Sequence, residues 1–236
     1  MTMSASGAAL IAILAISSLK AAEPADIGGT WKIVGAIKEL KTTDGKTPSL
    51  TPTGAEVYKQ NRAKWQAGDL SFDPSARCIS PGLPRALTLP YAFKIFQSDK
   101  QVFFLFEWNH WYRNVRLTDR ELEVPYPMSM GVATGHWDGN TLVIKTVGLR
   151  ADNTLLDSSG MPHSERLQLT ERVTLVDRNT LRDRVTIDDP DTFTHTWNTE
   201  LTFKRQPTQT EIREDVCLDR VDTNQPAIDW KKARKK

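Results

Sequence analysis

Three ionisable side chains interrupt apolar strand faces in the second half of the chain, and their types suit proton-transfer chemistry. Residues 161–205 alternate between apolar and polar side chains, which predicts three consecutive antiparallel strands with one buried face each. Glu171, Asp183 and His195 fall on those apolar faces, where a charge is costly unless it is paired. A buried carboxylate with a raised pKa beside an imidazole could move protons without a cofactor.

The turns between these strands predict which residues lie opposite one another. A polar turn at residues 177–179 places Glu171 opposite Val185. The turn at residues 189–192 predicts Val185 opposite His195. Glu171 and His195 would then share one row across three strands, with the second carboxylate beside them and about 4.8 Å for each strand step. A slip of one residue would turn the whole set toward solvent.

Arg113 and His163 complete the candidate catalytic set. The guanidinium of Arg113 could hold an oxyanion, and His163 lies in a polar loop, a setting that often carries function. For His110 and His195 a purely structural hydrogen bond is the alternative. A second set of residues is predicted to contact a substrate: Tyr91, Glu107, Asn109, His110, Trp111, His136, Trp137 and Trp197.

The sequence lacks the usual patterns of several other kinds of site. No two of the four histidines are spaced i, i+2 or i, i+4, so no metal site is predicted. Ser164 directly follows His163 and cannot face it across a strand, and no nucleophile elbow is present. A glycine-rich phosphate loop is also absent from the sequence. Cofactor-free acid–base chemistry is the remaining catalytic interpretation, of lyase, hydratase or isomerase type.

Charge and length restrict the class of protein. The 236 residues carry a net charge of +2, and five basic residues lie among the last six positions. The body is therefore slightly acidic and offers no basic face for nucleic acid. We expect one domain over residues 23–236 that ends in a solvated basic tail. The oligomeric state is not predictable from these features.

An export signal is predicted for residues 1–22, which places the mature protein in the periplasm or outside the cell. An apolar run ends near residue 19 and is too short to span a bilayer, and Ala21 and Ala22 offer a cleavage point. The segment before the run has no Lys or Arg, which weakens the pattern. In an oxidising compartment Cys78 and Cys217 are expected to form a disulfide, and two separately buried thiols are the alternative.

The elements that position the candidate residues are mostly strands. One helix is expected over residues 53–66, and a hairpin is expected around the turn at residues 138–140. A closing strand is expected over residues 211–218. The sequence thus predicts an all-β, antiparallel, up-and-down barrel of about nine or ten strands with one or two short helices. Six aromatic residues could face its interior: Tyr91, Phe93, Phe103, Trp111, Trp137 and Trp197.

Two sets of motifs resemble known families. Gly29-Thr30-Trp31 at the start of the first strand is similar to the opening of lipocalin and calycin barrels. That resemblance implies that Trp31 closes one barrel end under Lys204 or Arg205. An ordered series of blocks resembles a large group of secreted bacterial proteins with an implied lipocalin-like barrel: Arg77-Cys78, Pro81-Gly82-x-Pro84-Arg85, Glu107-x-x-His110-x-x-Arg113, Gly135-x-Trp137-x-Gly139, Gly160-x-Pro162-His163-Ser164-Glu165, Glu171-Arg172 and Asp189-Pro190. His136 stands where the resemblance implies Arg or another polar residue.

Three functions fit this pattern. The first is an exported enzyme that acts by acid–base chemistry on a partly hydrophobic or aromatic molecule held in the barrel. The second is a periplasmic binding protein for a hydrophobic small molecule. The third is a structural envelope protein with a fully packed barrel. No cofactor is expected in any of the three, and no membrane segment is expected after signal cleavage.

Overall fold

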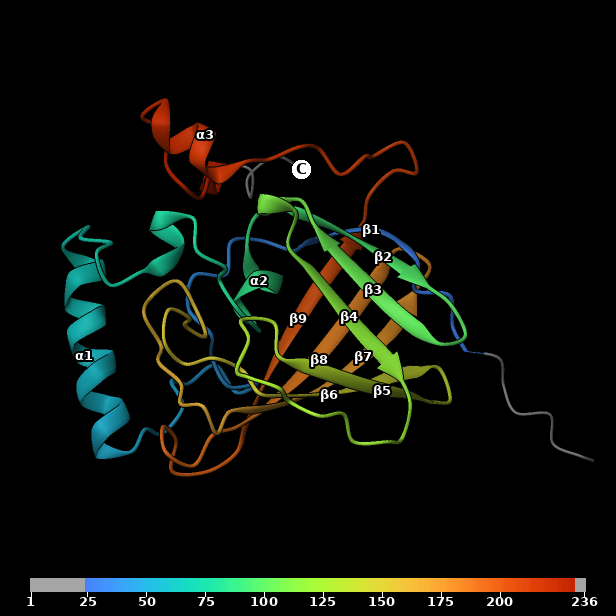
Figure 1. Cartoon of the computed structure of the whole chain (residues 1–236), viewed down its shortest axis with the longest axis horizontal. Coiled ribbons are helices and arrows are strands. Elements are labelled where there is room, and N and C mark those ends of the chain that lie inside the picture. Colours follow the sequence, from blue (N-terminus) through green and yellow to red (C-terminus); the bar gives the residue numbers. More distant parts are fainter. Residues whose placement is uncertain (1–23, 232–236) are drawn as a thin grey trace, which may run out of the picture.

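Nine strands close into a barrel in the computed structural model of the chain, which describes residues 24–231 (Figure 1). Each strand pairs with the next along the chain, and the last strand closes on the first. The expected all-β barrel is confirmed. The strands are β1 (Gly29–Ile33), β2 (Ala92–Gln97), β3 (Gln101–Phe106), β4 (Tyr112–Leu117), β5 (Val132–Asp138), β6 (Thr141–Val147), β7 (Gln168–Asp177), β8 (Thr180–Asp188) and β9 (Trp197–Arg205).

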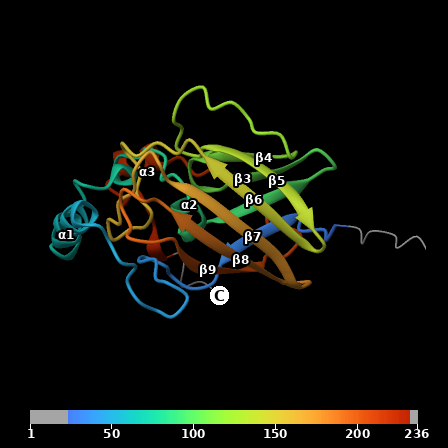
Figure 2. The same ribbon diagram turned by 90° about the horizontal axis from the view of Figure 1, so that it is seen from below.

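One strand pair departs from the expected antiparallel pattern. β4 and β5 run parallel and pair only at their Val115↔Ala133 to Leu117↔Gly135 positions. Residues 118–131 carry the chain back to the starting end of β4, in the long loop at the top of Figure 2. Parallel neighbours need such a crossover, whereas a hairpin can join only antiparallel strands.

The expected closing strand at residues 211–218 is not formed. β9 already pairs with β1, so the barrel has no free edge for another strand. The chain instead runs without regular structure to α3 (Cys217–Asp222). The predicted helix is confirmed as α1 (Pro52–Gln66), which Thr51 caps by accepting from the Gly54 amide at 3.1 Å.

One barrel end is closed in the way that the resemblance implied. Trp31 is fully buried and donates from its indole nitrogen to the carbonyl of Ile27 at 2.9 Å. The guanidinium carbon of Arg205 lies 4.2 Å from the ring centroid of Trp31, a cation–π contact. Arg205 is therefore the residue that covers Trp31, while Lys204 donates to Thr180 on the neighbouring strand β8.

The inward side chains of the strands pack into a continuous apolar core. Phe93 on β2 meets Phe203 on β9 edge to face, with ring centroids 5.1 Å apart. Trp197 also lies in this core, packed edge to face against Phe193. Phe103 was expected inside, but it lies on the outer face of the sheet, where it stacks on the exposed ring of Tyr112 at 5.5 Å.

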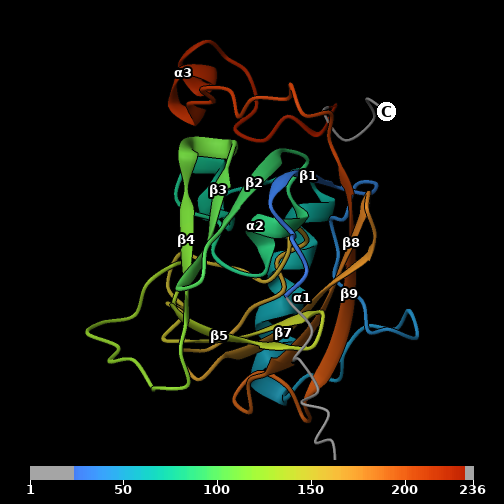
Figure 3. The ribbon, with the colours of Figure 1, turned by 90° about the vertical axis from the view of Figure 1, so that its right-hand side faces the viewer.

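The predicted disulfide is confirmed, and it fastens the C-terminal segment to the barrel. Cys78 and Cys217 are bonded with their Cα atoms 5.6 Å apart. Cys78 follows the 3₁₀ turn η1 (Pro74–Arg77), and Cys217 begins α3. In Figures 1 and 3 this segment crosses one end of the barrel. Two smaller helical elements are α2 (Arg85–Thr88) and the turn η2 (Trp108–His110), and Trp108 donates to the carbonyl of Ala227 in the C-terminal segment at 2.8 Å.

The expected signal peptide at residues 1–22 and most of the basic tail lie outside the described residues. Among residues 24–231 no helix is both long enough and apolar enough to cross a membrane.

Candidate functional site

A charged cluster lies inside the barrel on four strands. Arg113 on β4 donates from Nη1 to Glu171 Oε1 on β7 at 2.9 Å, and its Nη2 donates to the other carboxylate oxygen. The same Nη2 donates to Thr146 Oγ1 on β6 at 2.7 Å. Asp183 on β8 is the fourth member, and all four residues are at most 2% exposed. The bidentate contact between Arg113 and Glu171 fixes the orientation of the guanidinium and the carboxylate.

Asp183 is the acid of this cluster. Burial raises its pKa well above the usual range, and the negative charge of Glu171 and a hydrogen bond to Glu171 act in the same direction, while Arg113 opposes them. The site therefore favours the protonated form of Asp183, while Arg113 pairs with Glu171. Asp183 Oδ1 has no hydrogen-bond partner among the described residues.

The predicted row of ionisable groups is confirmed for the carboxylates and wrong for the histidine. Glu171 lies opposite Val185, as expected. Val185 lies opposite Thr199 and not His195, because β9 begins only at Trp197. His195 is exposed, in the loop before the strand.

The loop before β9 explains this error in register. The amide of Phe193 donates to the carbonyl of Asp189 at 2.8 Å, and Phe193 forms an isolated bridge with Leu50. The chain is thus held in a longer connection than the sequence suggested. Because the shift is four residues, an even number, the inward face of β9 keeps the predicted set of odd-numbered residues.

His163 is buried in the loop before β7, and its hydrogen-bond partners do not belong to the charged cluster. Its Nε2 is 2.8 Å from Thr154 Oγ1, and its Nδ1 is 2.9 Å from the carbonyl of Ser164. Burial lowers its pKa, so the neutral imidazole is favoured. Both ring nitrogens are occupied, which is the arrangement of a structural histidine.

A cavity of about 540 Å³ opens where the barrel wall is incomplete. Residues 112–114 of β4 precede its pairing with β5, so within the described chain they have no strand neighbour on that side. Residues 118–131 arch over this gap, as Figures 2 and 3 show. We call this space the wall cavity; its lining includes Trp111, Arg113, Asn114, Met128, Ser129 and Met130.

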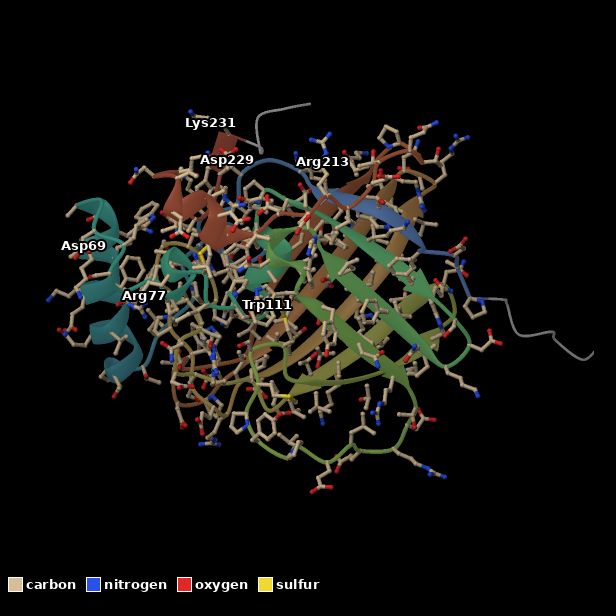
Figure 4. All side chains as sticks on the ribbon, turned by 45° about the horizontal axis from the view of Figure 1, so that its top comes forward. Asp69, Arg77, Trp111, Arg213, Asp229 and Lys231 are labelled. Atoms are coloured by element: carbon tan, nitrogen blue, oxygen red, sulfur yellow. A yellow bond between two sulfur atoms is a disulfide. The ribbon has the colours of Figure 1, made fainter. Side chains whose placement is uncertain are left out.

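Three neighbouring residues of the wall cavity carry unpaired polar atoms. Trp111 Nε1, Arg113 Nε and Asn114 Oδ1 are buried and have no hydrogen-bond partner within residues 24–231. Trp111 lies just before β4, where Figure 4 labels it. A buried polar atom left unpaired costs about 1–3 kcal/mol. Arg113 points into the barrel, whereas Asn114 pairs opposite the outward Phe103, so the cavity at this strand edge has an unpaired donor of Arg113 on one side and the unpaired acceptor of Asn114 on the other.

Three other predicted binding residues join the barrel to the C-terminal segment. Asn109 donates to the carbonyl of Cys78 at 3.2 Å and accepts from the Cys217 amide at 2.8 Å. His110 is exposed, with Nε2 2.9 Å from the carbonyl of Arg213. Tyr91 accepts from the amide of Asp229 at 2.8 Å. These hydrogen bonds therefore hold the C-terminal segment against the barrel and indicate a structural role for the three residues.

The remaining predicted binding residues also lie apart from the wall cavity's lining. Glu107 accepts from the Ala92 amide at 3.2 Å. His136 is exposed on β5. Trp137 is half-buried and packs on the core, and Trp197 is inside it. Of the predicted binding set, only Trp111 lines the wall cavity.

Sequence reasoning missed several residues of this site. Asn114 is one polar residue among the alternating residues of β4, and Met128 and Met130 lie in a loop without periodicity. They line a cavity because β5 pairs late, which no local pattern predicts. Thr146 could have been found, because it lies on the same inward face of β6 as Leu142 and Ile144.

No group of three or more His, Cys, Asp or Glu side chains within residues 24–231 is arranged to hold a metal ion. Searches against models of known protein families and against curated protein sequences gave no match.

Proposed function

We propose that this protein binds a small, partly hydrophobic molecule in the wall cavity. The observation that carries the proposal is the run of unpaired polar atoms on Trp111, Arg113 and Asn114, all of which line one cavity. Buried polar atoms are usually paired. A ligand that forms hydrogen bonds with these atoms would remove the free-energy cost of leaving them unpaired.

The lining indicates what such a ligand carries. Trp111 Nε1 and Arg113 Nε can only donate, and Asn114 Oδ1 can only accept. The ligand would therefore present acceptor oxygens beside one donor, as a hydroxy-carbonyl compound does. Met128 and Met130 lie with Leu122 and Pro125 along the same cavity and suit an aromatic or terpenoid body.

The test of this proposal uses the free-energy cost of an unpaired polar atom in the protein without ligand. Asn114→Leu removes the unpaired acceptor, so we expect an unchanged or higher melting temperature and a ligand affinity about fivefold to tenfold lower. Ligands come from a thermal-shift screen of aromatic and terpenoid molecules. Asn198→Leu is the matched control, because Asn198 accepts from Thr186 at 2.6 Å and lies on β9; it should lower stability and leave affinity unchanged. Equal affinity of Asn114→Leu and the parent protein would contradict the proposal.

A second candidate function is a cofactor-free acid–base enzyme of lyase, hydratase or isomerase type. The observation in its favour is the buried Asp183, whose pKa is raised by burial and by Glu171, close to Arg113, which lines the wall cavity. Asp183 would supply a proton and Arg113 would hold an oxyanion. No described histidine contacts the cluster, so binding ranks first. Product formation from a bound ligand, abolished in Asp183→Asn while binding persists, would establish the enzyme.

We also propose that the chain is an exported lipocalin-like protein. The closed barrel, the Trp31–Arg205 closure and the Cys78–Cys217 bond support this proposal. N-terminal sequencing of the protein from periplasm and medium tests it: a mature end after Ala22 is expected, and an intact Met1 in the cytoplasm would contradict export.

A further inference from the structure

A second cavity, of about 440 Å³, lies outside the barrel between the helical segments and the C-terminal segment. One wall contains the end of α1 and η1, and the other contains α3 and the chain after it. Figure 4 labels Asp69 and Arg77, which lie in or next to the first of these segments, and Asp229 and Lys231, which lie in the chain after α3. We call this cavity the helical groove; its lining includes Lys38, Trp65, Arg85, Ser158, Val221 and Trp230.

A buried ion pair forms the base of the helical groove. Arg85 donates from Nη1 and Nη2 to the two oxygens of Asp73, each at 2.6 Å, and its side chain is 1% exposed. The Ser75 amide also donates to Asp73 at 2.9 Å. Both carboxylate oxygens of Asp73 are thus occupied, so the negative charge in the groove is already satisfied.

Two buried polar atoms at the helical groove remain unpaired. Arg85 Nε and Ser158 Oγ have no hydrogen-bond partner among the described residues, and both residues line the cavity. Ser158 is 5% exposed. Arg85 Nε can only donate, and the Ser158 hydroxyl can donate as well. The free polar groups therefore favour a ligand that accepts hydrogen bonds.

Aromatic rings and a cation border the same space. The Lys38 ammonium lies 5.2 Å from the ring centroid of Trp230, and Lys38 is exposed. Trp65 on α1 lines the same cavity, and the Arg62 guanidinium lies 4.8 Å from its ring centroid. Val221 adds an exposed apolar side chain. A flat apolar body would stack here, and a negative group would be attracted to Lys38.

We propose that the helical groove binds a small aromatic carboxylate. The ring would lie against Trp65 and Trp230, and the carboxylate would accept from Ser158 Oγ and Arg85 Nε near the charge of Lys38. This site shares no lining residue with the wall cavity. It is therefore an additional site, and its existence does not depend on the function proposed above.

Isothermal titration calorimetry with 2-naphthoate tests this proposal, with the neutral 2-naphthamide as a comparison. We expect 2-naphthoate to bind and the amide to bind more weakly. Ser158→Ala should weaken 2-naphthoate binding about fivefold, the value of one hydrogen bond. Since Ser158 Oγ is unpaired, its removal should leave the fold intact. Lys38→Gln should weaken binding and reduce its dependence on salt.

Matched controls use the same substitutions at other places. Lys94→Gln removes a lysine that lies 5.2 Å from the Phe96 ring on β2, and Ser129→Ala changes a serine of the wall cavity. Both controls should bind 2-naphthoate like the parent protein. Absence of binding, equal binding of the amide, variants that behave like their controls, or a loss in Ser129→Ala would each overturn the proposal.

Discussion

At the scale of single residues, Arg113 links the interior of the barrel to the wall cavity. Its two terminal nitrogens are used by Glu171 and Thr146, whereas its Nε has no partner within the described chain. Arg113 therefore contributes both to the buried ion pair and to the lining of the wall cavity.

The alternation of β7 and β8 was sufficient to predict that Glu171 and Asp183 lie inside the barrel. Arg113 was placed in the same candidate site to hold an oxyanion, but its ion pair with Glu171 was not predicted, because the two residues lie on strands distant in sequence. His195 was misplaced because the length of the loop before β9 depends on Phe193 and its bridge to Leu50. Both failures concern contacts between distant segments, which local periodicity does not encode.

Removal of the Arg113 guanidinium should lower the free energy of unfolding of the protein by a large part. In Arg113→Met, Glu171 would be left in the core without the guanidinium that pairs it, so we expect a loss of about 3–5 kcal/mol in the free energy of unfolding. Urea denaturation measures this loss. Arg172→Met is the control on β7, because the exposed Arg172–Asp138 pair should contribute less than about 1 kcal/mol. Equal losses in the two variants would contradict a buried ion pair that matters for stability.

His163 should make the protein less stable in mild acid. Burial lowers its folded-state pKa, so the unfolded chain binds a proton first as the pH falls below about 6.5. Its contribution is therefore fully present above that pH and is lost as the pH falls through the folded pKa. His163→Gln should reduce the fall in melting temperature between about pH 7 and pH 5. His136→Gln, at an exposed position, should leave that fall unchanged; the same slope in His163→Gln would refute the assignment.

At the scale of elements, the late pairing of β5 creates the wall cavity. Residues 118–131 return along β4 before pairing begins, and Gly131 directly precedes β5 with a φ of +61°. A Cβ there would lie 2.7 Å from both Thr146 Cγ2 and the carbonyl of Val147. Glycine is therefore needed for two reasons, the positive φ and the close approach of β6.

Gly131→Ala should destabilise the protein and distort the wall cavity. The left-handed backbone alone costs about 1–2 kcal/mol, and the contact with β6 adds to it. Gly45→Ala isolates the first cost, because Gly45 has a φ of +81° and no atom within 4 Å of its added Cβ. Thermal unfolding should show a larger loss for Gly131→Ala. Similar losses would mean that the close approach to β6 contributes nothing.

At the scale of the whole molecule, the barrel was predictable and its attachments were not. Strand number, the Trp31 closure and the disulfide follow from alternation, one motif and two cysteines in a chain expected to be exported. The C-terminal segment was misassigned as a strand, because its apolar residues pack on Tyr91 and Trp108 rather than on a sheet edge. That packing creates the helical groove, which no motif in the sequence indicates.

The disulfide should support the helical groove more than the wall cavity. It joins η1 to α3, which lie on opposite walls of the groove, across 139 residues of sequence. In the loop-entropy description its loss costs about 5 kcal/mol of stability. We therefore compare the Cys78→Ser/Cys217→Ser protein with the parent under conditions where circular dichroism shows both to be folded. Affinity for 2-naphthoate should fall at least about tenfold, because the two walls are no longer joined. Binding of a screened ligand at the wall cavity should fall less, since among the residues that line this cavity only Trp111 packs on the apolar cluster that contains Cys217. Parallel loss at both sites would show that the disulfide acts on the whole barrel, and unchanged 2-naphthoate binding would show that packing of the C-terminal segment alone holds the groove.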